Sequence, residues 1–433
     1  MSTHILNIPA AGAAAVPVFG ISEWQNYYRG DEPGIGAPEI IDRCVEAHAA
    51  VGVDSIVWNA GRGTILYHSD LPHTTVQYEL GFVPKPERVS CEYVRRVMSA
   101  CCPLRRAIAL GQERGMPILG RLSMNRHYGT PANIDSNSRF RRGHPEWVER
   151  GKLGEPIGNR MCYAVPEVRQ ERLDILLEIQ RIGVDALVLD FCRQMPIIWY
   201  HKAVIQPYIE KTGIDPRTID TAEPADYASW FQFRADVLTG FMRSLRSKVR
   251  AQEHELDRPC PIIARVPDYT EWLMIACSLD IETWFREDLI DATMLSPFPR
   301  LRDDLKSYPG YHVQVAHRYD KPCIGGVGSN GMKERRDVLP DPEAAVAYGC
   351  RVAHDQYRAG VDAMSLYQSE ALCRKDYLRK MIANLGQKEW IATVAEKVPE
   401  PPRDDPRYFI GKDWHCGPRN EGLGTAVCGN LAL

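Results

Sequence analysis

Short apolar runs alternate with longer amphipathic segments along most of the chain. Three of the runs share one pattern, in which a glycine and then an aspartate come just before the apolar residues, at residues 51–57, 182–188 and 359–365. Glycine can adopt the left-handed conformation that closes a helix, and a short apolar run suits a strand buried on both faces. Each pattern therefore predicts a helix end followed at once by a buried strand.

A segment with helical periodicity precedes each of these three junctions. The segments lie near residues 39–50, 165–181 and 342–358, and Pro166 and Pro342 stand where a first helical turn would begin. Repeated helix-to-strand junctions indicate a parallel sheet whose strands are joined by crossover helices.

Five further apolar runs complete the set of predicted strands. They are residues 16–21, 117–122, 261–266, 291–295 and 321–326. Eight strands with intervening helices predict an α/β fold of the (β/α)8 TIM-barrel type. A doubly wound sheet is less favoured, because no GxGxxG turn follows the first strand.

Three connections that follow strand ends are long, at residues 60–98, 123–164 and 192–225. Barrel enzymes of this type place their chemistry at the carboxyl ends of the strands, where such βα loops begin. The catalytic barrel is predicted to cover residues 1–395. Residues 396–433 are rich in proline, glycine and charge, and predict a short C-terminal tail packed on the barrel.

Composition argues against several classes of protein. The chain is 44% hydrophobic with a formal charge of −3 and no long run of Lys or Arg, so no nucleic-acid partner is expected. The first residues lack the pattern of a secretory signal, and no apolar run has membrane-spanning length, so we expect a cytoplasmic protein without membrane contact. The 13 irregularly spaced cysteines predict reduced, mostly buried thiols. Self-association into a homo-oligomer stays open.

The strongest chemical signal is the apolar run 185–189, which ends in Asp190 and is followed by Arg193. An acid at a strand end of this fold usually faces the active-site pocket. The alternative is a structural ion pair between Asp190 and Arg193 at the rim of the barrel.

Glycoside hydrolysis requires two carboxyl groups, one to protonate the leaving oxygen and one to act as nucleophile or base. Asp190 and Glu370, which follows the eighth predicted strand, are the first-choice catalytic pair. Glu370 could instead cap a helix predicted at about residues 371–385. Asp268, just after the fifth strand, is the reserve acid, and Glu23 ranks behind it.

Polar and aromatic side chains at the strand ends suit a sugar, because amides hold hydroxyl groups and aromatic faces stack on pyranose rings. The expected substrate contacts are Trp58, Asn59, Asn125, His127, Tyr128, Arg193, Arg265 and Tyr367. For Asn125, His127 and Tyr128, which follow the third strand, the alternative is that they cap the loop by hydrogen bonds to its backbone. Core packing is the alternative for the aromatic residues, including Trp24, Trp199 and Tyr200.

Two other kinds of site receive weaker support. The glycine-rich segment 325–331 could hold a phosphate or form a plain loop. The histidines His68, His127, His201 and His317 are scattered and form no zinc motif, so no metal or other cofactor is expected.

Six segments together resemble bacterial family-10-like glycosyl hydrolase proteins. They are WNAGRGTILYHS (58–69), LSMNRHYG (122–129), HPEW (144–147), YAVPEVRQERLDILLEI (163–179), VDALVLDFCRQMP (184–196) and ARVP (264–267). The resemblance implies a glycosidase-type barrel with Asp190 as a catalytic carboxylate and with Asn125 and His127 as substrate contacts. The chain departs from the related alpha-amylase pattern in the fifth strand, where residues 263–266 contain no glutamate.

The sequence therefore predicts a glycoside hydrolase of carbohydrate metabolism that uses paired carboxylates. A barrel lyase or isomerase acting on a sugar or sugar phosphate is one alternative. A non-catalytic carbohydrate-binding barrel is the other.

Overall fold

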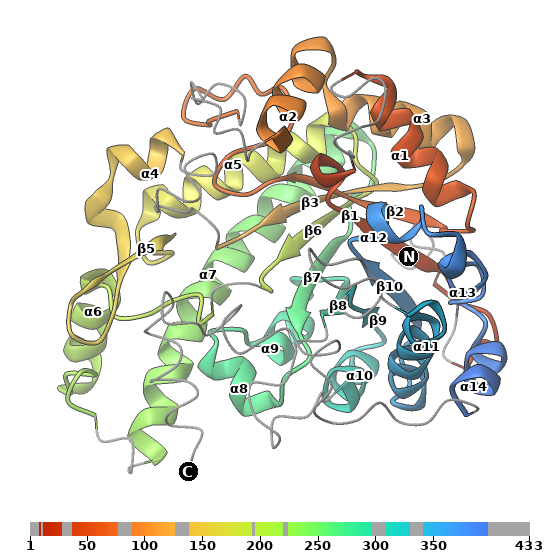
Figure 1. Cartoon of the computed structure of the whole chain (residues 1–433). Coiled ribbons are helices and arrows are strands. Elements are labelled where there is room, and N and C mark those ends of the chain that lie inside the picture. The colour runs from red at the N-terminus through yellow and green to blue at the C-terminus, as the bar shows by residue number, and fades with distance from the viewer. Residues whose placement is uncertain are drawn as a thin grey trace.

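Eight parallel strands close into a barrel at the centre of the molecule (Figure 1). The computed structural model describes residues 8–9, 12–27, 37–76, 89–125, 138–192, 195–219, 224–296, 309–329 and 341–396. The barrel strands, in chain order, are β1 (Val18–Ser22), β2 (Ser55–Gly61), β3 (Ile118–Ser123), β6 (Ala186–Asp190), β7 (Ile262–Pro267), β8 (Ala292–Ser296), β9 (Cys323–Val327) and β10 (Ala363–Tyr367). The eight predicted strands and the (β/α)8 fold are confirmed.

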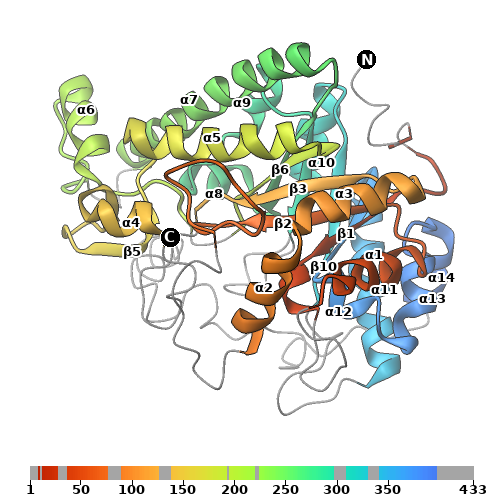
Figure 2. The ribbon, with the colours of Figure 1, turned by 90° about the horizontal axis from the view of Figure 1, so that it is seen from above.

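Helices pack outside the ring of strands, as the two views in Figures 1 and 2 show. The longer ones are α1 (Glu39–Ala49), α2 (Val89–Ala100), α3 (Pro103–Arg114), α5 (Pro166–Ile182), α6 (Lys202–Thr212), α7 (Pro224–Leu256), α10 (Pro309–Arg318), α11 (Pro342–Arg358) and α14 (Lys388–Glu396). The shorter ones are α4 (Arg139–Gly143), α8 (Glu271–Ala276), α9 (Ile281–Arg286), α12 (Ser369–Leu372), α13 (Arg379–Ala383) and the turns η1 (Trp24–Asn26), η4 (Pro145–Trp147) and η5 (Asp376–Leu378). None of the described helices combines the length and apolarity that a bilayer span needs.

The glycine of each predicted junction closes a helix as expected. Gly52, Gly183 and Gly360 have φ angles of 75°, 122° and 97°. Such positive values strain any residue with a Cβ atom, which explains why glycine stands at these three positions.

The aspartate of each junction binds the backbone of the neighbouring strand. Asp54 Oδ2 accepts a hydrogen bond from Val18 N at 2.7 Å. Asp185 and Asp362 make the same bond to Ile118 N and Cys323 N, both at 2.8 Å. These carboxylates fix the register of adjacent strands at the amino ends of the barrel.

The prediction of one helix at about residues 371–385 is wrong. The structure has α12, η5 and α13 there instead. Lys375 takes an extended backbone conformation, which ends helical hydrogen bonding. Just before it, the Arg374 guanidinium lies over the Tyr27 ring, 4.5 Å from its centroid, and donates to Tyr27 O. These contacts hold the chain against the segment that follows β1.

The long connection after β3 contains a β-hairpin that the sequence analysis did not predict. Its strands are β4 (Val148–Arg150) and β5 (Pro156–Met161), paired antiparallel. Figures 1 and 2 both place α4, β5 and α6 together at one end of the molecule. The predicted tail at residues 396–433 lies outside the described residues apart from Glu396. The cysteines whose side chains are described are free thiols, and most are buried.

Glu149 in this hairpin is fully buried, and its carboxylate lies near the Cys162 thiol and the charge of Arg160. Burial raises the pKa of Glu149 from 4.5 to about 7, although the Cys162 thiol and the charge of Arg160 oppose the shift. As the pH rises from 4.5 to about 7, Glu149 loses its proton in the unfolded chain before it does in the folded chain. The stability of the fold should therefore fall between these two pH values and level off above them.

We expect Glu149→Gln to abolish this loss. At pH 8 the variant should gain about 3 kcal/mol in free energy of unfolding over the wild type, and at pH 4.5 almost nothing. Urea denaturation at both pH values measures the difference. Glu113→Gln, which changes an exposed carboxylate on α3, is the matched control. An equal gain at both pH values would contradict the assignment.

Candidate active site

The alternation of side chains along the strands builds a polar layer above an apolar one. Phe19, Ile21, Val57, Leu119, Val188, Ile263 and Met294 belong to one apolar cluster inside the barrel. Side chains two residues apart on a strand share a face. The next inward positions toward the carboxyl ends are Glu23, Asn59, Arg121, Asp190, Arg265 and Ser296, and Tyr367 follows Ser365 in the same way.

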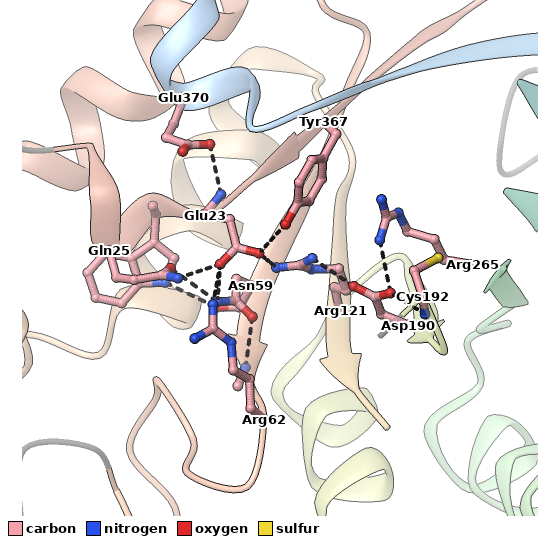
Figure 3. A network of polar contacts seen from close by, with 12 residues as sticks. Glu23, Gln25, Asn59, Arg62, Arg121, Asp190, Cys192, Arg265, Tyr367 and Glu370 are labelled. Atoms are coloured by element: carbon pink, nitrogen blue, oxygen red, sulfur yellow. Dashed lines mark hydrogen bonds and ion pairs between the residues drawn. The ribbon is translucent and has the colours of Figure 1, made fainter. Parts of the chain in front are cut away.

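Asp190 lies between two arginines on the strands either side of its own. Its Oδ2 accepts from Arg121 Nη1 on β3 at 2.8 Å, and its Oδ1 accepts from Arg265 Nη1 on β7 at 2.9 Å. Cys192 N also donates to Oδ1 at 3.1 Å. The carboxylate, at 3% exposure, is therefore fixed in place (Figure 3).

Both guanidiniums are buried and charged. Burial opposes the charged form of Arg121, but Glu23 and Asp190 outweigh it and raise its pKa. Arg265 shows the same balance, with Asp190 raising its pKa against the effect of burial. Arg265 also donates to Ser296 Oγ at 2.7 Å and lies over the Tyr367 ring, 4.7 Å from its centroid.

Glu23 is the centre of a network of polar contacts whose other members are Gln25, Asn59, Arg62, Arg121, Asp190, Arg265 and Tyr367. Its Oε1 accepts from Arg121 and lies 3.5 Å from the Tyr367 hydroxyl oxygen. Its Oε2 accepts from Gln25 Nε2 at 2.5 Å, Arg62 Nη2 at 2.8 Å and Asn59 Nδ2 at 3.2 Å. An ionised carboxylate offers about four acceptor positions, so these donors occupy Glu23 fully.

Glu370 and Asp190 stand at opposite ends of this network (Figure 3). Glu370 Oε2 accepts from the backbone N of Glu23 at 2.9 Å. The carboxylate of Glu370, only 1% exposed, thus anchors the chain just after β1. Glu23 and Arg121 lie between the two members of the predicted pair.

The other predicted site residues, apart from Trp58, fall into three groups. Asn59, Arg265 and Tyr367 belong to the network. Asn125 lies two residues beyond β3, and Asp268 directly follows β7; both are buried. His127, Tyr128 and Arg193 lie outside the described residues, so the alternative pairing of Arg193 with Asp190 stays untested.

Trp58 does not belong with these residues. It alternates with the inward positions 57 and 59, is fully buried, and stacks on Trp24 with ring centroids 6.0 Å apart. It therefore packs between the barrel and its helices, which corrects its prediction as a sugar contact. Trp199 and Tyr200 are also buried in aromatic packing.

Arg121 is the main residue that the sequence analysis missed. A signal for it exists, because Arg121 is the one charged residue in the apolar strand ILGRLS and stands at an inward position. The sequence analysis considered Glu23 only as a candidate acid and missed its central place in the network. Its importance comes from partners on three other parts of the chain.

The structure also describes most residues of the two weaker site predictions, the glycine-rich segment and the scattered histidines. Gly325 and Gly326 are part of strand β9 and not of a loop, and a Cβ on Gly325 would approach Val361 to 2.9 Å. Residues 330–331 lie outside the described part. His68, His201 and His317 bind Met98 O, Glu146 O and the Asp362 carboxylate, respectively. Within the described residues, no three His, Cys, Asp or Glu side chains gather as metal ligands.

Comparison with solved structures places this fold among known barrels. The chain is similar to alpha-L-fucosidase isoenzyme 2 from Paenibacillus thiaminolyticus, with a TM-score of 0.54 and 13% identity over 87% of this chain and 49% of that one. The chain has the fold of a TIM barrel. It spans about half the length of the fucosidase.

Two further solved structures carry related names. One is the catalytic domain of beta-amylase from Paenibacillus polymyxa, with a TM-score of 0.48 and 10% identity over 86% of this chain and 98% of that one. The other is an alpha-galactosidase from Thermus thermophilus, with a TM-score of 0.44 and 13% identity over 87% of this chain and 63% of that one. All three are glycoside hydrolases. No family model and no curated protein matches the chain by sequence, so the resemblance to family-10-like proteins stays a prediction.

Proposed function

We propose that the chain is a glycoside hydrolase that cleaves a glycosidic bond at the carboxyl ends of the barrel strands. One observation carries the proposal: Asp190 ends β6 inside the barrel and is held between Arg121 and Arg265. The similarity of the fold to a fucosidase supports a carbohydrate as the substrate class.

Asp190 is proposed as the ionised carboxylate of the reaction. Two neighbouring guanidiniums favour the charged form and fix its orientation. An ionised carboxylate at this position can attack the anomeric carbon directly or can take a proton from the attacking water. Asn59 and Tyr367, polar residues of the same network, would contact sugar hydroxyl groups.

The second carboxyl group must carry a proton and deliver it to the leaving oxygen. Glu23 does not suit this role, because its acceptor positions are filled by donors. Glu370 is committed to the backbone of Glu23. We assign the acid to Asp268 because of its position: it is buried one residue beyond β7, the strand next to that of Asp190.

A panel of aryl glycosides and oligosaccharides tests the function. It should include alpha-fucosides, alpha-galactosides and alpha-glucans, the classes suggested by the structural neighbours. Release of free sugar from at least one of them is the expected result. Tight binding of sugar without turnover would favour a non-catalytic carbohydrate-binding barrel, and an unsaturated or isomerised product would favour a lyase or isomerase.

Asp268→Asn tests the proposed acid. On a substrate with a poor leaving group, kcat should fall by roughly 10²–10⁴-fold, because an acid contributes most where the leaving oxygen is basic. On an activated nitrophenyl glycoside the loss should be much smaller. Glu370→Gln is the matched control and should affect both substrates alike. If the dependence on leaving group appears in Glu370→Gln instead, Glu370 is the acid.

A further inference from the structure

A cavity lies between the β4–β5 hairpin and α6 and shares no lining residue with the network around Asp190. Its volume is about 400 Å³, within the range of sites that bind small molecules. The hairpin contributes Arg150 and the turn glycines Gly151 and Gly154, and α6 contributes one face that begins at Lys202. The cavity therefore joins two elements that are distant in sequence.

Two cations of this lining are available to a ligand. Arg150 is half-buried and Lys202 is exposed, and neither side chain has a hydrogen-bond or ion-pair partner among the described residues. The third cation, Arg217, is already paired with Asp215 at 2.6 Å. Among the described residues of the lining, Glu146 is the only acid. Its Oε1 lies 3.3 Å from His144 Nδ1, and the charge of Lys202 also acts on it.

His201 in the same lining is a neutral, fixed residue. Its Nδ1 accepts from Ala203 N at 3.1 Å, and its Nε2 donates to Glu146 O at 2.9 Å. Burial lowers the pKa of His201, and the charges of Lys202 and Arg150 lower it further. The charges of Lys202 and Arg150 therefore both reach the His201 ring in the cavity wall.

The surrounding segment is basic although the chain as a whole is acidic. Residues 138–161 contain six Lys or Arg and three Asp or Glu, whereas the whole chain has a formal charge of −3. Glu149 and Arg160 in this segment are both buried, so five cations and two acids of the segment remain. Positive charge is therefore concentrated around the hairpin.

We propose that this cavity binds the anionic group of a small polar ligand, a carboxylate or a phosphate, through Arg150 and Lys202. A guanidinium presents a planar pair of donors to such a group, and an ammonium adds a point charge. Tyr200 and Ile205 form an apolar wall, and Gln206 can meet hydroxyl groups. This lining suits a sugar acid or a sugar phosphate. The site is independent of the proposed hydrolysis, because binding here needs no turnover.

Isothermal titration calorimetry at low salt, with inorganic phosphate and with glucuronate as probes and glucose as the neutral control, tests the site. We expect at least one anion to bind the wild type and glucose not to bind. Arg150→Gln and Lys202→Gln should each weaken the binding roughly 10-fold, about the contribution of one charge-assisted hydrogen bond. Lys248→Gln, an exposed lysine on α7, should leave it unchanged.

Binding of phosphate alone would show that the site recognises a phosphate group, and binding of glucuronate alone would show that it recognises a carboxylate. The absence of binding by the wild type to both anions would overturn the proposal. So would unchanged affinity in both cavity variants, or binding of glucose as tight as that of glucuronate. Because Lys202 is exposed, its substitution should leave the melting temperature unchanged, so a loss of affinity in that variant cannot be ascribed to misfolding.

Discussion

Asp190→Ala is expected to lower kcat on the best glycoside substrate by on the order of 10³-fold. The variant lacks the carboxylate that would attack the anomeric carbon or activate water, while Arg121 keeps Glu23 as its partner. Initial rates with aryl glycosides measure the effect. Added azide should restore part of the activity and form a glycosyl azide, because the small anion can occupy the space left by the carboxylate.

Glu23→Gln is the matched control for this experiment. It also changes a buried carboxylate bound to Arg121, but one that the network saturates. It should lower stability, and its residual activity should not respond to azide. If Asp190→Ala keeps most of its activity, or loses it without any azide rescue, Asp190 is only a structural partner of the arginines.

Arg121→Leu is expected to lower the free energy of unfolding by about 3–5 kcal/mol, the usual cost of removing one partner from a buried ion pair. Arg121 is 1% exposed and is the shared partner of Glu23 and Asp190. Its removal leaves these two buried carboxylates without the cation that lies between them. Urea denaturation at pH 7 measures the change.

Arg106→Leu provides the control for Arg121→Leu. Arg106 pairs with Asp42 on the surface at 2.6 Å, and exposed pairs of this kind contribute about 0–1 kcal/mol. A loss below 1 kcal/mol for Arg121→Leu would mean that the network relaxes around the missing cation. In that case, Arg121 would not hold Asp190 in position.

The barrel could be predicted because its strands and junctions are local patterns. Gly52, Gly183 and Gly360 each close a helix just before a buried strand, and that pattern needs only seven consecutive residues. The position of Asp190 at a strand end followed from the same pattern. The β4–β5 hairpin was missed because it is short and its strands carry as many polar residues as apolar ones.

The partners of Asp190 could not be predicted in the same way. Arg121 and Arg265 lie 69 and 75 residues away along the chain, and only the register of β3, β6 and β7 brings them together. Glu370 illustrates the converse. Its place after a strand suggested a catalytic acid, but the short helix α12 directs its carboxylate to the backbone of Glu23.

The aspartates at the amino ends of the strands have a consequence for engineering this barrel. Asp54, Asp185 and Asp362 hold the backbone of neighbouring strands at the end opposite to Asp190. Segments that follow the carboxyl ends can therefore be exchanged to change substrate range without touching the bonds that align the strands. A library built on this chain should keep those three acids constant and draw its diversity from the other rim.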